Sequence, residues 1–294
     1  MEYTQQRQFS VIDFGIKISD FKSVQKITFS APFPLSVNDI IDLSHYLKHE
    51  ESQLIFSDLK YKFEEETNKY SSINNGNEKI VFLPIKHNTG NKKYYDNVIP
   101  NQNDSDNFHI TIDVKKYLHI PGDTTAIYFR FRIKSNQITQ TMLRKLKDKN
   151  YYLESAFLER QTIDIKFNDA RNIDSAESSR IEGFKFHFAK FRSVHLFLMV
   201  PSSYEVTIWD NFSDCRQLEN GWGNYLQTSE PIDDIIVYHW QKKDTISNQL
   251  DKFTQLIKIE YKYTNLKLII LYCLVVIVLG AFGSGLASFF SNLF

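Results

Sequence analysis

Basic and apolar residues alternate over residues 125–134, and this pattern is the clearest sign of binding chemistry in the sequence. Arg130, Arg132 and Lys134 share one face of the expected strand, because successive side chains on a strand point to opposite faces. The other face carries Ile127, Phe129, Phe131 and Ile133. Guanidinium and ammonium groups bind phosphate and carboxylate oxygens through charge-assisted hydrogen bonds. The pattern therefore predicts a site for an anionic ligand, such as a nucleotide or oligonucleotide.

Later basic residues extend this expected face. They are Lys166, Lys185, His187, Lys190 and Arg192. Tyr128 or Phe191 is available to stack on a nucleobase. The alternative is an ordinary solvated sheet face, since alternating charges are common on exposed strands. Acidic and basic residues are equal in number, 35 each, which favours a local ligand site over broad binding of nucleic acid.

Two Asp-x-Lys pairs match the spacing found in metal-dependent nucleases of the restriction type. Asp113 with Lys115, and Asp164 with Lys166, each place a carboxylate and an ammonium on one face of a strand. Any solvated strand produces the same alternation, so an ordinary polar face is the favoured interpretation. A membrane-tethered nuclease is the third hypothesis for function.

Motifs of the common enzyme classes are absent from the sequence. It contains no GxxxxGK[ST], HExxH, CxxC or GxSxG, and its eight His residues are scattered. We therefore expect no catalytic residues, no metal site and no cofactor, and we expect that the protein is not an enzyme.

The C-terminal region is a long apolar run. Residues 268–294 include no Asp, Glu, Lys, Arg or His, and roughly 20 apolar residues suffice to cross a bilayer. Lys258, Lys262 and Lys267 precede the run and no basic residue follows it, so the positive-inside rule places the preceding part in the cytoplasm. The sequence predicts a single-pass protein of the bacterial inner membrane, with a transmembrane helix over 267–294 and a cytoplasmic N-terminal domain.

Small residues gather in the second half of this helix. They form two neighbouring rows at helical spacing: Gly280, Ser284, Ser288 and Ser291, and Gly283, Ala287 and Ser291. Small residues let transmembrane helices approach closely, which predicts a homo-oligomer, with a tetramer as the working number. Serine hydroxyls facing a shared axis would line a narrow pore, whereas a helix that only dimerises carries the same pattern. The expected partners are the lipid bilayer and other copies of the chain.

The segment before the membrane helix, residues 244–266, is predicted to be an amphipathic linking helix. Its apolar residues recur at intervals of three and four, and no Gly or Pro interrupts them: Ile246, Leu250, Phe253, Ile257 and Tyr261. Such a helix would pass motion from the soluble part to the membrane. A helix packed on its own domain is the alternative.

Residues 1–240 are predicted to form a β-rich sensor domain, an antiparallel sandwich or barrel, because short alternating segments follow one another. The predicted strands are Val11–Ile18, Gln25–Phe29, Leu54–Phe63, Lys79–Ile85, Phe108–Val114, Thr125–Lys134, Thr162–Phe167, Phe184–Phe191, Val194–Met199, Glu205–Trp209 and Ile235–Trp240. Helices are expected over 36–49 and 138–149, and a division into two subdomains near 136–150. Long surface loops around one short strand are expected over 64–107, which is rich in Asn, Asp and Lys.

The two cysteines and the N-terminus fit a cytoplasmic location for this domain. Cys273 lies inside the apolar run, where a disulfide to Cys215 is geometrically implausible. The first residues mix polar and charged side chains with apolar ones, so they lack the apolar core of a signal peptide.

This order of parts resembles the transmembrane effectors of bacterial anti-phage defence, and most of all the channel-forming effectors of the Hailong system. The resemblance covers the whole chain and rests on domain order and on the character of the last helix. It implies a soluble domain held closed by deoxyadenylate oligomers that a partner nucleotidyltransferase makes. We expect an oligomeric membrane effector, an ion-conducting pore gated by a nucleotide or oligonucleotide. The alternative is a tail-anchored protein-interaction module without a pore.

Overall fold

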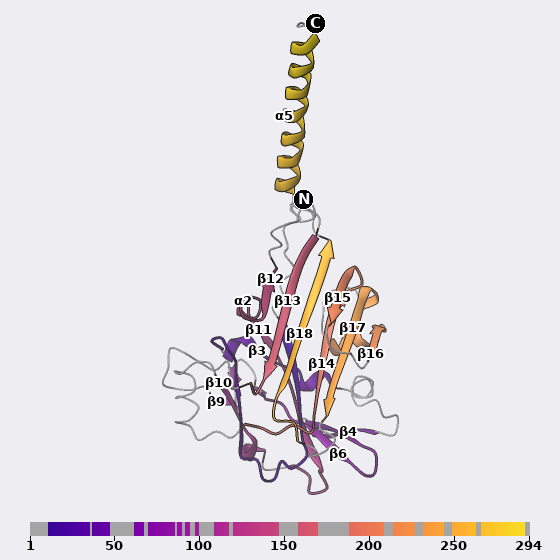
Figure 1. The fold of residues 1–294 in the computed structure, drawn as a ribbon. Coiled ribbons are helices and arrows are strands. Elements are labelled where there is room, and N and C mark those ends of the chain that lie inside the picture. The colour runs from indigo at the N-terminus through magenta and orange to yellow at the C-terminus, as the bar shows by residue number, and fades with distance from the viewer. Residues whose placement is uncertain are drawn as a thin grey trace. The chain divides into compact units, whose positions relative to one another are not determined.

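The computed structural model describes residues 11–35, 37–47, 62–67, 70–85, 87–89, 92–94, 98–99, 109–117, 120–146, 158–169, 188–208, 214–226, 232–243, 249–262 and 266–291. Within them the protein is mainly β, with several antiparallel sheets and an apolar helix at the C-terminal end, which confirms the predicted fold class (Figure 1). The chain divides into two compact units. The first holds residues 1–142 and 217–234, and the second holds residues 143–216 and 235–294.

The main sheet of the first unit is built around β11. Within the described residues its strand order is β1–β11–β6–β5–β4, and β3 also pairs with β11. The strands are β1 (Val11–Ile18), β3 (Ile40–Asp42), β4 (Lys62–Thr67), β5 (Tyr70–Asn74), β6 (Lys79–Phe82) and β11 (Ala126–Lys134). β11 runs antiparallel to β1 and parallel to β6.

A second sheet of the first unit supplies the other side of its hydrophobic core. It has the order β2–β10–β9, from β2 (Lys26–Ser30), β10 (His109–Asp113) and β9 (Val98–Ile99); β7 (His87–Thr89) and β8 (Lys92–Tyr94) form a separate hairpin. Ile110 and Ile112 of β10 share one core cluster with Phe129 and Phe131 of β11. The Phe29 ring of β2 meets the Phe131 ring edge to face at 6.0 Å. This unit is therefore a sandwich of two sheets.

Strand β11 is buried on both of its faces. One face, with Ile127, Phe129, Phe131 and Ile133, lies in the core between the two sheets. The opposite face begins with Ala126 and Tyr128, which belong to a second apolar cluster together with Leu47, Ile73, Ile80 and Phe82. A polar side chain that is buried further along this second face must find its partners inside the protein.

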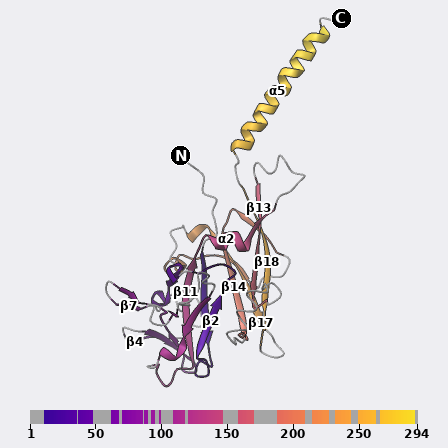
Figure 2. The ribbon, with the colours of Figure 1, turned by 90° about the vertical axis from the view of Figure 1, so that its left-hand side faces the viewer.

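The second unit contains two sheets. One has the order β12–β13–β18–β15, from β12 (Leu143–Lys145), β13 (Leu158–Phe167), β18 (Phe253–Lys262) and β15 (Tyr204–Ile208). The other has the order β14–β17–β16, from β14 (Ser193–Pro201), β17 (Ile235–Lys243) and β16 (Asp214–Gln217). β14 and β17 pair along their whole length (Figure 2).

The helices in the described part of the chain are α2 (Gln137–Met142), α4 (Trp222–Leu226) and α5 (Leu266–Ser291), with short 3-10 turns elsewhere. α5 has 26 residues, which corresponds to about 39 Å at 1.5 Å per residue and exceeds the roughly 30 Å of a hydrocarbon core. Residues Leu266–Phe289 are long and apolar enough to span a membrane, and none of their most apolar window is buried against described residues.

The predicted linking helix over 244–266 is wrong in the part that the structure describes, because Phe253–Lys262 is strand β18. Residues four apart lie on the same face of a strand as well as of a helix, so the spacing of Phe253, Ile257 and Tyr261 fits both. Gln255 and Ile259 decide the matter. They are buried with Phe253 and Ile257, which gives a period of two, and β18 pairs with β13 on one side and β15 on the other.

Two further helices were predicted too long. In 36–49 the chain forms 3-10 turns at Val37–Asp39 and Ser44–Tyr46 around β3, because pairing with β11 uses its backbone groups and the Ser44 N–H binds the Asp42 carboxylate. In the described part of 138–149 the helix is α2, which ends at Met142 because β12 follows and pairs with β13.

The prediction of surface loops over 64–107 is also wrong for much of that range. β5 and β6 lie there, and Ile73, Ile80, Val81 and Phe82 are fully buried. The strand predicted over 79–85 is found as β6, whereas β5 was not predicted, because its buried Ile73 lies among polar residues. The strand predicted over 54–63 falls largely outside the described residues, as does much of the one over 184–191.

Gly15 of β1 provides a test of the packing against β11. A Cβ at this position would overlap the Tyr128 hydroxyl and lie 2.9 Å from its Cζ. We expect Gly15→Ala to lower the free energy of unfolding by about 1–3 kcal/mol, as overpacking does in cores. Denaturant unfolding of the detergent-solubilised protein measures the change. Gly122→Ala is the control, because no atom lies within 4 Å of its Cβ; equal effects at both positions would contradict the overlap.

Candidate functional site

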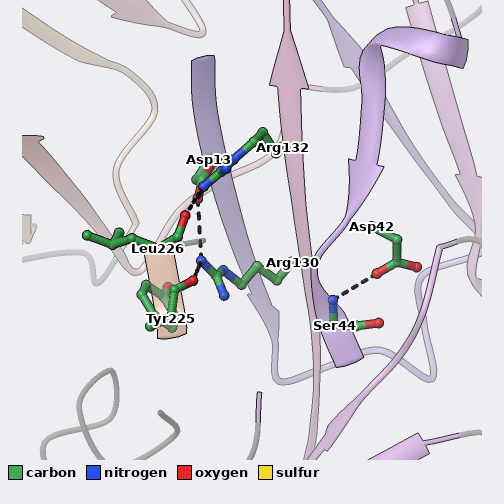
Figure 3. Close-up of polar contacts among 7 residues, drawn as sticks. All are labelled: Asp13, Asp42, Ser44, Arg130, Arg132, Tyr225 and Leu226. Carbon is green, nitrogen blue, oxygen red and sulfur yellow. Dashed lines mark hydrogen bonds and ion pairs between the residues drawn. The ribbon is translucent and has the colours of Figure 1, made fainter. Parts of the chain in front are cut away.

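Arg130 and Arg132 meet one carboxylate, that of Asp13 on β1. In the antiparallel register of β1 and β11, Asp13 lies directly opposite Arg132. Arg132 donates from Nε to Asp13 Oδ1 at 2.6 Å and from Nη2 to Oδ2 at 2.9 Å, a two-pronged pair. Arg130 Nη2 approaches the same Oδ2 at 3.4 Å (Figure 3). Two guanidinium groups therefore share one carboxylate, and this cluster keeps one net positive charge.

The end of helix α4 completes this arginine cluster. Arg130 Nη2 donates to the Tyr225 carbonyl at 2.7 Å, and Arg132 Nη2 donates to the Leu226 carbonyl (Figure 3). The Tyr225 ring covers the Arg130 guanidinium, with Cζ 3.5 Å from the ring centroid, a cation–π contact. Carbonyls at the C-terminal end of a helix have no partner within the helix and favour a nearby cation. The two arginines supply that cation.

Arg130 is the most enclosed charge of the cluster. Its side chain is 1% exposed, and its Nε and Nη1 atoms are buried without a hydrogen-bond partner in the described part of the chain. Burying a guanidinium with donors unsatisfied costs free energy. The hydrogen bonds of Arg130 therefore offset only part of the free-energy cost of burying its guanidinium, and the packing around it opposes the rest.

Two tyrosines border the site, Tyr128 on β11 and Tyr225 on α4. Their side chains are joined by a hydrogen bond. Burial is the main cause that raises the pKa of both phenols, so both are neutral at pH 7 and neither contributes a counter-charge to Arg130.

The expected basic face of β11 is divided by the fold. Arg130 and Arg132 are covered by α4 and paired with Asp13, so they do not lie on a solvated sheet face. The apolar residues of the opposite face are buried, as predicted. Lys134, at the end of the strand, is exposed, and the described residues provide no ion-pair partner for its ammonium. The role of all three in binding a ligand stays a prediction.

Lys134 lines a shallow pocket of about 520 Å³ in the first unit. The other lining residues are Pro34, Asn38, Asp39, Ile41, Ser135, Asn136 and Gln137. The pocket offers an ammonium, a carboxylate, a hydroxyl and several amides, so it suits a small polar ligand better than an apolar one.

The remaining predicted basic residues do not join this cluster. Lys166 lies on β13 of the second unit and binds Asp164 of the same strand at 2.7 Å. Lys185 and His187 lie outside the described residues. Asp113 accepts a hydrogen bond from the Lys115 backbone and caps a 3-10 turn, so this Asp-x-Lys pair is not a strand pair. The described residues hold no cluster of three or more potential metal ligands.

Two histidines of the second unit form a pair that sequence analysis missed. His195 Nδ1 and His239 Nε2 lie 3.1 Å apart, and the Phe197 ring stacks on His239 at 4.3 Å. Burial, then the charges of His239 and Lys243, lower the pKa of His195. Burial lowers the pKa of His239 too, and Asp214 acts in the opposite direction. Both rings are therefore neutral at pH 7 and share one hydrogen bond.

The small residues of α5 remain open to a partner helix. No described atom outside the helix lies within 4 Å of a Cβ at Gly280 or Gly283. Ser291 donates its hydroxyl to the Ser288 carbonyl at 3.0 Å, within the helix itself. Ser284 and Ala287 are exposed in the same stretch. A shallow apolar depression beside them is lined by Ala281, Phe282, Gly285 and Leu286.

Asp13, Tyr225 and Leu226 also escaped the sequence analysis. Asp13 is the single acidic residue of a largely apolar strand, and this is the signal that could have pointed to a counter-charge. Tyr225 and Leu226 act mainly through backbone carbonyls, which carry no sequence signal.

Compared with known protein families, curated proteins and solved structures, the chain matches none of them.

The shared carboxylate makes Asp13 the most sensitive charge of the arginine cluster. We expect Asp13→Asn to lower the free energy of unfolding by about 2–4 kcal/mol, between the values for exposed and fully buried pairs, because it leaves two guanidinium groups without a counter-charge. Denaturant unfolding measures this. Asp164→Asn breaks an exposed pair and should cost about 0.5 kcal/mol or less. Similar losses for both variants would refute the central role of Asp13.

The histidine pair predicts a loss of stability in acid. A folded-state pKa below the unfolded value means that the unfolded chain binds protons more readily. The contribution is complete above about pH 6.5, the usual histidine pKa, and is lost as pH falls through the lowered folded-state pKa. The urea midpoint of His195→Gln/His239→Gln should therefore fall less than that of the wild type between pH 7.5 and 5.5. Equal falls would show that the pair does not titrate as proposed.

Proposed function

We propose that this protein is an oligomeric, single-pass effector of the bacterial inner membrane, with a role in anti-phage defence. The observation that carries the proposal is α5. Its apolar surface is not covered by described residues of its own chain, so lipid or other copies of the helix must cover it. The lysines before it favour a cytoplasmic location for the β-rich units.

Self-association of α5 is supported by the distribution of its side chains. The first half presents bulky residues such as Leu274, Val276 and Ile277, which pack against lipid as well as against protein. The second half presents Gly280, Ser284 and Ser288, around which neighbouring helices can approach closely. Close packing also gives the serine hydroxyls protein or water as neighbours in place of lipid. An ion-conducting pore is the arrangement we propose.

An anionic ligand, a nucleotide or oligonucleotide, is proposed to set the state of the assembly. Lys134 supports this, because its exposed ammonium stands in a polar pocket whose volume is within the usual range of roughly 300–1,000 Å³ for ligand sites. A ligand shifts an equilibrium between closed and open arrangements by binding one of them more tightly.

The connection between the second unit and the membrane helix is short in the sequence. β18 ends at Lys262 and α5 begins at Leu266, so three residues separate a strand paired on both sides from the membrane helix. A rearrangement of this sheet can therefore act on α5 with little slack in between.

A tail-anchored protein-interaction module is the second candidate. The observation that favours it is the internal pairing of Arg130 and Arg132, which engages two of the predicted ligand contacts within the protein. Under this alternative α5 only anchors or dimerises.

Leucine substitution on the small face of α5 separates the two functions. We expect Gly280→Leu/Ser284→Leu/Ser288→Leu to abolish higher oligomers and ion flux from liposomes, because bulky side chains keep the helices apart. Cross-linking and a fluorescent-ion flux assay, with and without short oligonucleotides, provide the readout. Val276→Leu, in the bulky half, is the control and should keep both properties. Oligomers that conduct no ions under any condition would remove the pore and leave the interaction module.

A further inference from the structure

Helix α4 lies on a short excursion of the chain. Residues 217–234 belong to the first unit, whereas β16 before them and β17 after them have their other residues in the second unit. The two ends of the excursion are tied together, because the Gln217 side chain donates to the Asp233 carbonyl. After α4 the chain continues through the 3-10 turn Ile232–Asp234 into β17, which pairs with β14 throughout.

The first unit holds α4 by apolar packing and by hydrogen bonds whose acceptors another group could replace. Trp222 and Leu226 are buried, and the Tyr225 ring stacks on Arg130. The hydrogen bonds, by contrast, run from Arg130 and Arg132 to neutral backbone carbonyls. A hydrogen bond from a guanidinium to a carbonyl is already charge-assisted, but an oxyanion acceptor adds the attraction between opposite charges. An oxyanion is thus a better partner for these arginines than the end of α4.

The burial of Arg130 gives a physical reason for α4 to undock. While α4 is docked, Nε and Nη1 of Arg130 are buried without partners in the described residues, and the cluster keeps one net positive charge. Undocking would return these donors to water and so recover part of the desolvation penalty. That gain opposes the loss of apolar contacts and brings the docked and undocked states closer in free energy.

We infer that α4 is a releasable clasp, and that an oxyanion-bearing ligand of the phosphate type competes with its carbonyls for Arg130 and Arg132. The oxyanion binds the undocked state, in which the arginines are accessible, and shifts the population toward it. The inference rests on the proposed function for its ligand class, and it adds a second, covered anion site and a route from that site to β17.

Hydrogen exchange of the full chain in lipid nanodiscs tests the clasp, with inorganic pyrophosphate as the probe and potassium chloride at matched ionic strength as the reference. Pyrophosphate should speed exchange of the amides in Trp222–Leu226. Tyr225→Ala keeps both arginines but removes the stacked ring, so its basal exchange should rise by about fivefold, and less pyrophosphate should be needed. Arg132→Met should exchange faster at rest and lose most of the response to pyrophosphate.

Arg160→Met is the matched control, because Arg160 of β13 also pairs with a carboxylate, that of Glu260 on the neighbouring strand. It should keep the wild-type response. The clasp is overturned if pyrophosphate leaves α4 unchanged in the wild type, or speeds its exchange equally in Arg132→Met. Liposome flux separates the two proposals. Release of α4 in a protein that never conducts supports the clasp and removes the pore, whereas gated conduction with an unresponsive α4 removes the clasp.

Discussion

One carboxylate holds two guanidinium groups in place, and the first unit depends on this arrangement. β11 is largely buried on both faces, and Asp13, which stands opposite Arg132 in the register of β1, gives its two arginines a shared counter-charge. A shift of β1 by one residue would turn Asp13 to the other face and remove that counter-charge. The charge pairing therefore favours the same register as the apolar core does.

Much of the fold followed from the period of the hydrophobic pattern. β1, β11 and the apolar helix are long and regular, and their patterns admit one interpretation. Segments with mixed signals failed for a specific reason. In β18, residues spaced by four satisfied helix and strand alike, and only the partners on either side select the strand. In β5, the buried Ile73 lies among polar residues, so composition alone indicated a loop.

The candidate site was only half visible in the sequence. The alternation of Arg130, Arg132 and Lys134 was a local signal, but the partners lie 94 to 119 residues away in sequence. Asp13 is recognisable only once the register is known. The carbonyls of α4 cannot be recognised from side chains at all. Exposure is likewise a tertiary property: the same strand buries Arg130 and presents Lys134, because α4 covers one position and not the other.

The junction of β18 and α5 limits how copies of the chain can be arranged. From Lys262 to Leu266 the backbone reaches at most about 14 Å. Packed helices have axes roughly 8–10 Å apart, whereas four strands at about 4.8 Å spacing form a sheet about 19 Å wide. In the proposed oligomer, sheets broader than the spacing of their helices would fan outward around a tight bundle. The width of the sheet would thereby limit how closely the helices of such an oligomer can pack and how many of them can do so.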